Sequence, residues 1–257
     1  MKSITQYILF TFILLCPLVS PCQRIAVLGD SNTWLGGDNC GSQRGWTYWF
    51  GQEIRPESLR SYARSGATWT NTTATVANVD ENISVLGDNN VIYNQVLRLN
   101  ADNKPSPDYI IIGAGTNDAW FSGKRPNAFA QSVEQAWGQN DNDVLNMEAS
   151  EVTSLALSVR HNVLLLKQRH PKAHIVLLTP MQTTSAPTEL IAQAGDIIEQ
   201  CGKRLNCHVI RLDKESKVVA QNERRRKVYT SDGTHTSVRG AKSNGILIAT
   251  SLRNLFK

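Results

Sequence analysis

The side chains best suited to chemistry in this sequence are a serine, a histidine and an aspartate. Ser31 lies in the stretch VLGDSNTW, directly after an apolar run. A serine hydroxyl is a weak nucleophile and needs a neighbouring base. His235 lies in the polar loop SDGTHTSVRGAK, three residues after Asp232. This spacing lets the Asp232 carboxylate bind one imidazole nitrogen, which leaves the other nitrogen to accept the serine proton.

The other histidines indicate structural or surface roles. His161 and His170 fall in a long amphipathic stretch, and His174 and His208 begin apolar runs. The loop around His235 is also compatible with an ordinary turn, because Asp-Gly is a common turn dipeptide. The sequence has neither a C-x-x-C nor an H-E-x-x-H pattern, so no Cys/His spacing indicates a zinc site.

Two further motifs offer hydrogen-bond donors. Acyl transfer develops negative charge on a carbonyl oxygen, and donors placed there stabilise it. Asn117 in GAGTNDAW can donate from its amide, and Gly66 in SGATW has a backbone N–H that no side chain obstructs. Each motif alone could be a plain strand-to-helix loop. Together with the serine and the Asp-x-x-His loop, they supply the parts that a serine esterase requires.

The apolar runs before these motifs predict the strands of one sheet. We expect strands at residues 24–30, 59–64, 108–115, 174–180 and 207–213, and helices at 45–54, 90–99, 151–170, 188–205 and 240–256. Nearly continuous apolar strands that alternate with helices are typical of a parallel sheet covered on both faces, which is a three-layer α/β/α sandwich. Ligands of such folds bind beyond the carboxyl ends of the strands, where the motifs lie.

The chain of 257 residues fits a single domain after a leader. Residues 1–22 combine Lys2, an apolar run and a small or polar end, which predicts a signal peptide cleaved after Cys22 and export to the periplasm or the exterior. The run is too short for a stable membrane span, and Pro21 disfavours a lipid anchor on Cys22. Residues 23–257 form the predicted domain, and the Asn-, Asp- and Gln-rich residues at about 119–150 are interpreted as an insertion.

The cysteines leave open whether a disulfide forms. Export makes a disulfide between Cys201 and Cys207 feasible, with Cys40 as the odd thiol, but the sequence does not decide whether it forms.

The net charge is +5, and the one dense basic run is ERRRK, residues 223–227. We interpret this run as a solvated loop or helix end, with an anionic partner as the alternative. The other basic residues are scattered, which disfavours nucleic-acid binding.

The motifs resemble those of the SGNH (GDSL-type) hydrolases. The resemblance is carried by GDSN at 29–32, Gly66 in ARSGAT, GTND at 115–118 and DGTH at 232–235, which follow the family's order over most of the mature chain. It implies a flavodoxin-like α/β/α fold with a mainly five-stranded parallel sheet. The implied mechanism uses no metal or cofactor.

The resemblance also implies residue roles. Ser31 would be the nucleophile, His235 the general base and Asp232 the residue that orients it. The backbone N–H groups of Ser31 and Gly66 and the amide of Asn117 would form the oxyanion hole. Two positions depart from the family pattern: Asn32 replaces leucine, and Ala63 stands where asparagine is frequent. The absence of G-x-S-x-G argues against the α/β-hydrolase fold.

The positions of three tryptophans indicate a class of substrate. Trp34, Trp69 and Trp120 closely follow the motifs, so they are candidates for stacking on sugar rings, although core packing is the alternative. An exported esterase with such residues is predicted to remove acetyl groups from a carbohydrate. A lysophospholipase or thioesterase, and a noncatalytic glycan-binding protein, are the other functions considered. The sequence does not predict an oligomeric state.

Overall fold

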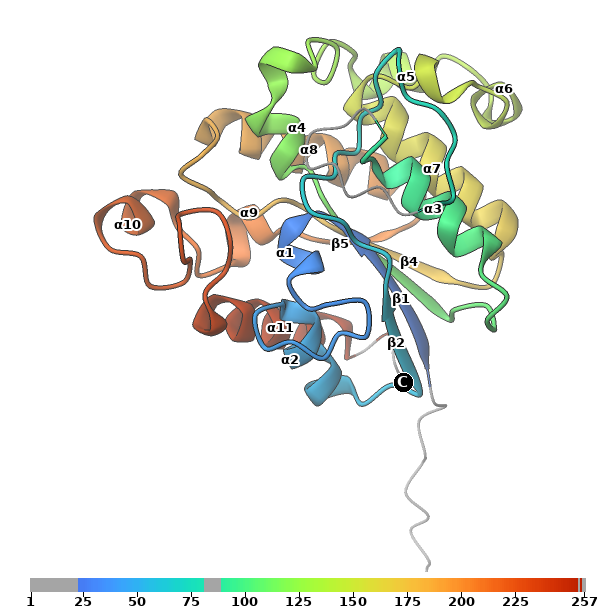
Figure 1. Ribbon diagram of the computed structural model, residues 1–257. Coiled ribbons are helices and arrows are strands. Elements are labelled where there is room, and N and C mark those ends of the chain that lie inside the picture. The colour runs from blue at the N-terminus through green and yellow to red at the C-terminus, as the bar shows by residue number, and fades with distance from the viewer. Residues whose placement is uncertain (1–22, 81–88, 254, 256–257) are drawn as a thin grey trace, which may run out of the picture.

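A parallel sheet of five strands forms the centre of the computed structural model, which describes residues 23–80, 89–253 and 255 (Figure 1). The strands are β1 (Arg24–Gly29), β2 (Ser58–Ser61), β3 (Tyr109–Gly113), β4 (His174–Leu178) and β5 (His208–Ile210). They lie in the order β2-β1-β3-β4-β5, and every neighbouring pair is parallel. The predicted sheet is confirmed, whereas the predicted signal peptide at 1–22 lies outside the described residues.

Helices cover both faces of the sheet because strand residues alternate between two hydrophobic clusters. Ala26 and Leu28 of β1 join one cluster, and Ile25 and Val27 join the other. The first is covered by α3 (Ile92–Ala101), α7 (Leu155–Arg169) and α8 (Thr188–Arg204), and the second by α2 (Trp46–Ile54) and α11 (Val238–Leu252). This arrangement confirms the three-layer α/β/α sandwich.

The fifth strand is shorter than the sequence predicts. It ends at Ile210, and α9 (Leu212–Glu215) follows at once. The Asp213 carboxylate accepts hydrogen bonds from the Arg211 guanidinium and the Thr179 hydroxyl. These polar side chains satisfy one another at the strand end, a long-range arrangement that the apolar pattern does not reveal.

The long helix α7 begins later than expected, at Leu155. Ser154 caps it, because the Ser154 hydroxyl oxygen accepts the backbone N–H of Leu157 at 3.3 Å. Val152, which falls within the predicted helix at 151–170, precedes α7 but is still buried in the same hydrophobic cluster.

Residues 119–150 form short helices that pack on the α7 side of the sheet. They comprise the end of α4 (Thr116–Trp120), η1 (Ser122–Lys124), α5 (Val133–Ala136), α6 (Asp141–Leu145) and the start of η2 (Ala149–Glu151). Val133 and Val144 join the hydrophobic cluster of α7 and α8. The Arg160 guanidinium of α7 donates to the Ala136 carbonyl at 2.6 Å. The interpretation of this segment as an insertion stays a prediction.

The cysteines of the described residues carry free thiols, so the feasible Cys201–Cys207 bridge is not formed. The Cys201 thiol instead lies 3.7 Å from the Ala156 carbonyl oxygen. Among the described residues, no helix has the length and apolar character needed to cross a membrane.

Candidate active site

Ser31 lies at the carboxyl end of β1, as the first residue of the short helix α1 (Ser31–Trp34). The chain passes close to β3 there because Gly29 has no side chain: a Cβ on Gly29 would lie 2.5 Å from the Gly113 carbonyl oxygen. Asp30 caps the helix, and its carboxylate accepts the backbone N–H of Asn32 at 3.0 Å. The strand, the close approach and the cap together fix the Ser31 backbone.

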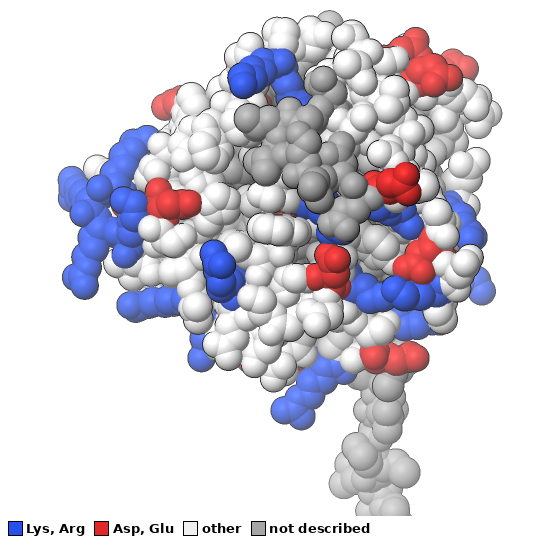
Figure 2. All heavy atoms as spheres, in the orientation of Figure 1, with Lys and Arg blue, Asp and Glu red and all other residues white. Residues whose placement is uncertain are grey.

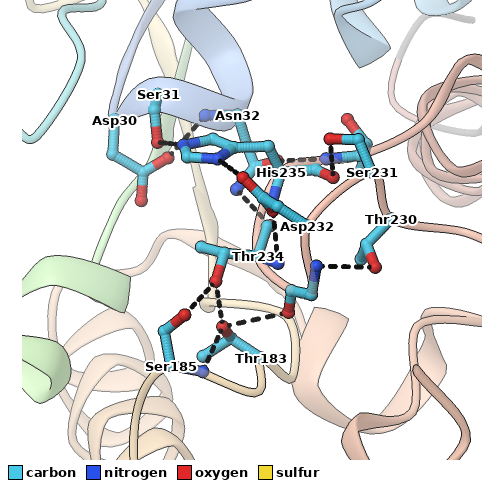
Figure 3. Close-up of polar contacts among 12 residues, drawn as sticks. Asp30, Ser31, Asn32, Thr183, Ser185, Thr230, Ser231, Asp232, Thr234 and His235 are labelled. Carbon is cyan, nitrogen blue, oxygen red and sulfur yellow. Dashed lines mark hydrogen bonds and ion pairs between the residues drawn. The ribbon is translucent and has the colours of Figure 1, made fainter. Parts of the chain in front are cut away.

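Ser31, His235 and Asp232 form one continuous chain of hydrogen bonds (Figure 3). The His235 Nε2 atom lies 3.0 Å from the Ser31 Oγ atom, and His235 Nδ1 lies 2.6 Å from Asp232 Oδ2. The other Asp232 oxygen accepts the backbone N–H groups of Thr234 and His235, at 2.8 and 2.7 Å. The aspartate therefore shapes its loop and binds the imidazole at the same time.

Electrostatics favour a charged Asp232. Burial raises the pKa of this carboxyl, but hydrogen bonds from the His235 ring and from the backbone N–H groups of His235 and Thr234 lower the pKa by more. The ionised carboxylate favours the imidazole tautomer with its proton on Nδ1. His235 Nε2 is then an acceptor for the Ser31 hydroxyl, which is the arrangement that general-base activation requires.

Donors that could bind an oxyanion lie on the loops after β2 and β3. Asn117, in α4, is buried, and its Nδ2 donates to the Ala67 carbonyl oxygen at 2.9 Å, which orients the amide and uses one of its two hydrogens. Gly66 has a φ of +78°, a left-handed conformation that glycine adopts readily. Among the described residues, the backbone N–H groups of Ser31 and Gly66 have no acceptor.

Asp118 holds these two loops together. Its buried carboxylate accepts the backbone N–H groups of Trp69 and Thr70 at 3.0 and 2.9 Å, and the Thr70 hydroxyl at 2.7 Å. Burial raises the pKa of this carboxyl. The residue after Asn117 thus fixes the segment that follows Gly66.

A protein-family comparison covers the segment that contains these residues. The model of the GDSL-like lipase/acylhydrolase family matches residues 27–242, which include Ser31, Gly66, Asn117 and His235. The chain belongs to this family. It is accordingly a carboxylic ester hydrolase, and the resemblance found in the four sequence motifs is confirmed.

Solved structures of GDSL-type and related proteins share the fold. A protein termed a possible lipase from Chitinophaga pinensis DSM 2588 is 16% identical, with a TM-score of 0.62 over 91% of this chain and 98% of its own. The lipase/acylhydrolase from Enterococcus faecalis is 19% identical, with a TM-score of 0.54 over 91% and 98%. The acetyl xylan esterase AlAXEase is 15% identical, with a TM-score of 0.52 over 90% and 98%. No curated protein matches the chain.

Asn32, where the GDSL motif has leucine, connects the two halves of the site. Its amide nitrogen donates to the Thr234 carbonyl at 3.2 Å, and its amide oxygen accepts the Thr236 backbone N–H at 3.0 Å. These bonds flank His235 on both sides, and a leucine could make neither of them. The departure from the motif was visible in the sequence, but its contacts were not.

A cluster of hydroxyl groups supports the same loop from below (Figure 3). The Thr234 hydroxyl lies 2.7 Å from that of Thr183 and 2.6 Å from that of Ser185. The Gly233 carbonyl accepts the Thr184 backbone N–H at 2.9 Å. The segment after β4 thus holds the histidine loop, a role that no pattern in the sequence indicated.

The tryptophan prediction is wrong for one residue. Trp69 is completely buried in the hydrophobic cluster under α3 and α7, so its ring has no face for a sugar. Its position after a motif reflects core packing. Trp34 and Trp120 are 44% and 40% exposed, and they end α1 and α4, the helices that carry Ser31 and Asn117.

Replacing Asn117 by alanine is expected to lower kcat by about 10²–10³-fold with little change in KM, because the lost donor would act mainly on the transition state. Hydrolysis of p-nitrophenyl acetate measures this. Asn162→Ala is the matched control, since Asn162 is also buried but donates within α7. An equal loss in both variants would exclude a role for Asn117 in the oxyanion hole.

Asp30 is expected to make stability depend on pH. Burial raises the pKa of its carboxyl to about 6, although the Asn32 backbone N–H and the Thr116 hydroxyl oppose this shift. A raised pKa contributes stability that is complete below about pH 4 and lost as the pH rises through 6. Asp30→Asn keeps the cap, so it should gain about 2–3 kcal/mol over the wild type between pH 4 and 7.

Urea unfolding of both proteins across this pH range measures the difference. Asp108→Asn is the control of opposite sign, because hydrogen bonds from Arg24 lower the pKa of Asp108. The Asp108→Asn variant should become less stable than the wild type as the pH rises from acidic values towards neutrality. A stability difference for Asp30→Asn that stays constant from pH 4 to 7 would contradict the expected titration of this group.

Proposed function

We propose that the protein is an exported serine esterase that acts through an acyl-enzyme on Ser31. The observation that supports this most directly is the continuous hydrogen bonding from Asp232 through His235 to the Ser31 hydroxyl. In this proposal Ser31 is the nucleophile, His235 the general base and acid, and Asp232 the residue that orients the imidazole. The proposal also treats residues 23–257 as one mature domain.

The first half-reaction forms the acyl-enzyme. Ser31 Oγ attacks the ester carbonyl carbon while His235 Nε2 takes the hydroxyl proton. The carbonyl oxygen becomes an oxyanion and accepts hydrogen bonds from the backbone N–H groups of Ser31 and Gly66 and from the Asn117 amide. When the C–O bond breaks, the imidazolium gives its proton to the leaving alcohol.

The second half-reaction repeats these steps with water. His235 Nε2 takes a proton from water, and the resulting hydroxide attacks the acyl carbon. The tetrahedral intermediate uses the same donors, and the imidazolium returns the proton to Ser31 Oγ as the carboxylic acid leaves. Every group in this scheme belongs to the chain, the ester or water, so the proposal assigns no metal or cofactor.

For the substrate, we propose an acetyl ester of a carbohydrate. Trp34 and Trp120 are exposed at the ends of the helices that begin with Ser31 and Thr116, where aromatic faces could stack on sugar rings. Trp120 itself stacks on Phe121 with ring centroids 5.2 Å apart, which keeps its ring in a defined orientation. The fold also accommodates this chemistry, since AlAXEase is an acetyl xylan esterase.

The test compares ester classes with one purified protein. We expect acetate release from acetylated saccharides and much slower cleavage of long-chain lysophospholipids and acyl thioesters. Efficient cleavage of the lipid esters without acetate release would overturn the carbohydrate proposal and favour the lipid-esterase alternative. N-terminal sequencing of the exported protein tests the leader, and a mature chain that starts at Gln23 is expected.

A further inference from the structure

The positive charge of the chain is concentrated in the segment that contains His235. Residues 214–242 hold eight Lys and Arg residues against three Asp and Glu residues. This excess of five charges equals the net charge of +5 of the entire chain, so the remaining residues are neutral in sum. A charge distribution this uneven creates a local positive potential, which attracts anionic ligands.

Within the described residues, the cations of this segment other than Lys214, which is paired with Asp196, lie on the surface without counter-ions. Figure 2 shows Lys and Arg side chains gathered at the left of the molecule, where Figure 1 has α10 (Ala220–Arg225). We define the basic face as Lys217, Arg224, Arg225, Arg226, Lys227, Arg239 and Lys242, all of which are exposed. Within the described residues none of them forms an ion pair, whereas Arg24 is paired with Asp108 and Arg253 with Glu53.

Part of the basic face surrounds a surface pocket of about 400 Å³. Lys217, Tyr229, Arg239 and Lys242 line it, together with the carboxylate residue Glu215 and part of α11. The Arg239 guanidinium lies 5.2 Å from the centre of the Tyr229 ring. A pocket that combines cations with an aromatic side chain suits a sugar ring that bears an acidic group.

The basic face is joined rigidly to the catalytic loop through Glu223. This buried carboxylate accepts the backbone N–H groups of Val228, Tyr229 and Thr230 at 3.0, 3.0 and 3.1 Å. The Thr230 hydroxyl donates to the same carboxylate at 2.6 Å and accepts the Gly233 backbone N–H at 3.1 Å. A chain bound along the exposed cations would therefore run beside the loop that carries His235.

We propose that the basic face binds the acidic groups of a polysaccharide and holds the acetylated unit of that polymer at Ser31. The ligand class is an acetylated polysaccharide with carboxylate or sulfate groups. This inference rests on the proposed esterase function and narrows its substrate. A polymer fits better than an anionic membrane because the cations and the catalytic loop form one continuous unit, so a single extended ligand can occupy both.

The experiment compares acetate release from acetylated polygalacturonate and from an acetylated neutral glucan, at 20 mM and 300 mM salt. At low salt, we expect KM for the acidic polymer to be at least tenfold lower than KM for the neutral one. High salt should raise KM for the acidic polymer and leave KM for the neutral one unchanged, because salt screens exposed charges. Equal KM values that do not respond to salt would overturn the inference but leave the acetylesterase proposal intact.

Variants locate the binding surface. Replacing the four residues Arg224, Arg225, Arg226 and Lys227 together by glutamine should raise KM for the acidic polymer at least tenfold more than KM for the neutral polymer. The matched control replaces four exposed cations at the amino edge of the sheet, namely Lys104, Arg169, Lys172 and Lys203, by glutamine. An equal effect of both sets would overturn the inference, since it would reflect net charge alone.

A binding measurement with an inactive variant tests the basic face independently of the esterase mechanism. The Ser31→Ala variant should bind polygalacturonate or dextran sulfate in a salt-dependent manner by calorimetry, and the two polymers distinguish carboxylate from sulfate recognition. Tighter binding to vesicles that contain anionic lipid than to either polymer would overturn the inference in favour of a membrane. If no acetylated polymer is cleaved although the variant binds, the substrate proposal fails and the binding surface stands.

Discussion

Replacing Ser31 by alanine is expected to lower kcat/KM for p-nitrophenyl acetate by about 10⁴–10⁶-fold, the scale on which serine hydrolases lose activity without their nucleophile. Ser31 is buried and its Oγ lies 3.0 Å from His235 Nε2, so the alanine variant lacks the one group that the base activates for attack on the ester. The variant removes one oxygen from a capped helix start, and its thermal unfolding should remain close to that of the wild type.

Covalent labelling tests the same assignment independently of turnover. An organophosphonate probe should label the wild type at Ser31 and should not label the alanine variant. Ser150→Ala is the control, since Ser150 is a half-buried serine within the short helix η2, and this variant should be labelled by the probe and active to the same extent as the wild type. Equal labelling of the wild type and Ser31→Ala would refute the assignment of Ser31 as the nucleophile. A wild type that resists the probe would favour the noncatalytic glycan-binding alternative.

The sheet could be predicted from the sequence because its signals are local. The run at residues 108–115 is nearly all apolar after Asp108, which occurs when both faces of a strand are covered. The Asp232–His235 contact is also local, because the partners are three positions apart and the carboxylate closes the turn between them. Ser31 and His235 are 204 positions apart, and no local pattern links them; the resemblance of their motifs to those of the SGNH hydrolases is what predicts that they meet.

Other parts of the site depended on contacts that no local pattern encodes. Asn32 and Thr234 meet through a single amide, and nothing around either residue in the sequence points to the other. Trp69 is a candidate for sugar stacking by its position after Gly66, with core packing as the alternative; Asp118 binds the Trp69 backbone N–H and the ring packs inward. Proximity in sequence to a motif therefore predicts the position of a backbone better than the direction of a side chain.

Replacing Asp232 by asparagine is expected to lower kcat by about 10³–10⁴-fold while the loop keeps its shape. The amide oxygen can still accept the backbone N–H groups of Thr234 and His235, which the structure places at 2.8 and 2.7 Å from Oδ1. The amide nitrogen then faces His235 Nδ1 and donates to it. The imidazole must carry its proton on Nε2, so it donates to Ser31 and cannot act as a base.

Comparison with Asp232→Ala distinguishes the effect of the wrong imidazole tautomer from the effect of a disrupted loop. Alanine removes both carboxylate oxygens, so this variant should lose thermal stability as well as activity, whereas the asparagine variant should lose activity alone. The wild-type contribution of Asp232 to stability has a defined sign: its pKa is lowered by folding, so the contribution is present at neutral pH and lost as the pH falls through the folded-state pKa. The asparagine variant should not show this loss of stability on acidification. If the loss remains in that variant, Asp232 is not the carboxyl that His235 holds in its charged form.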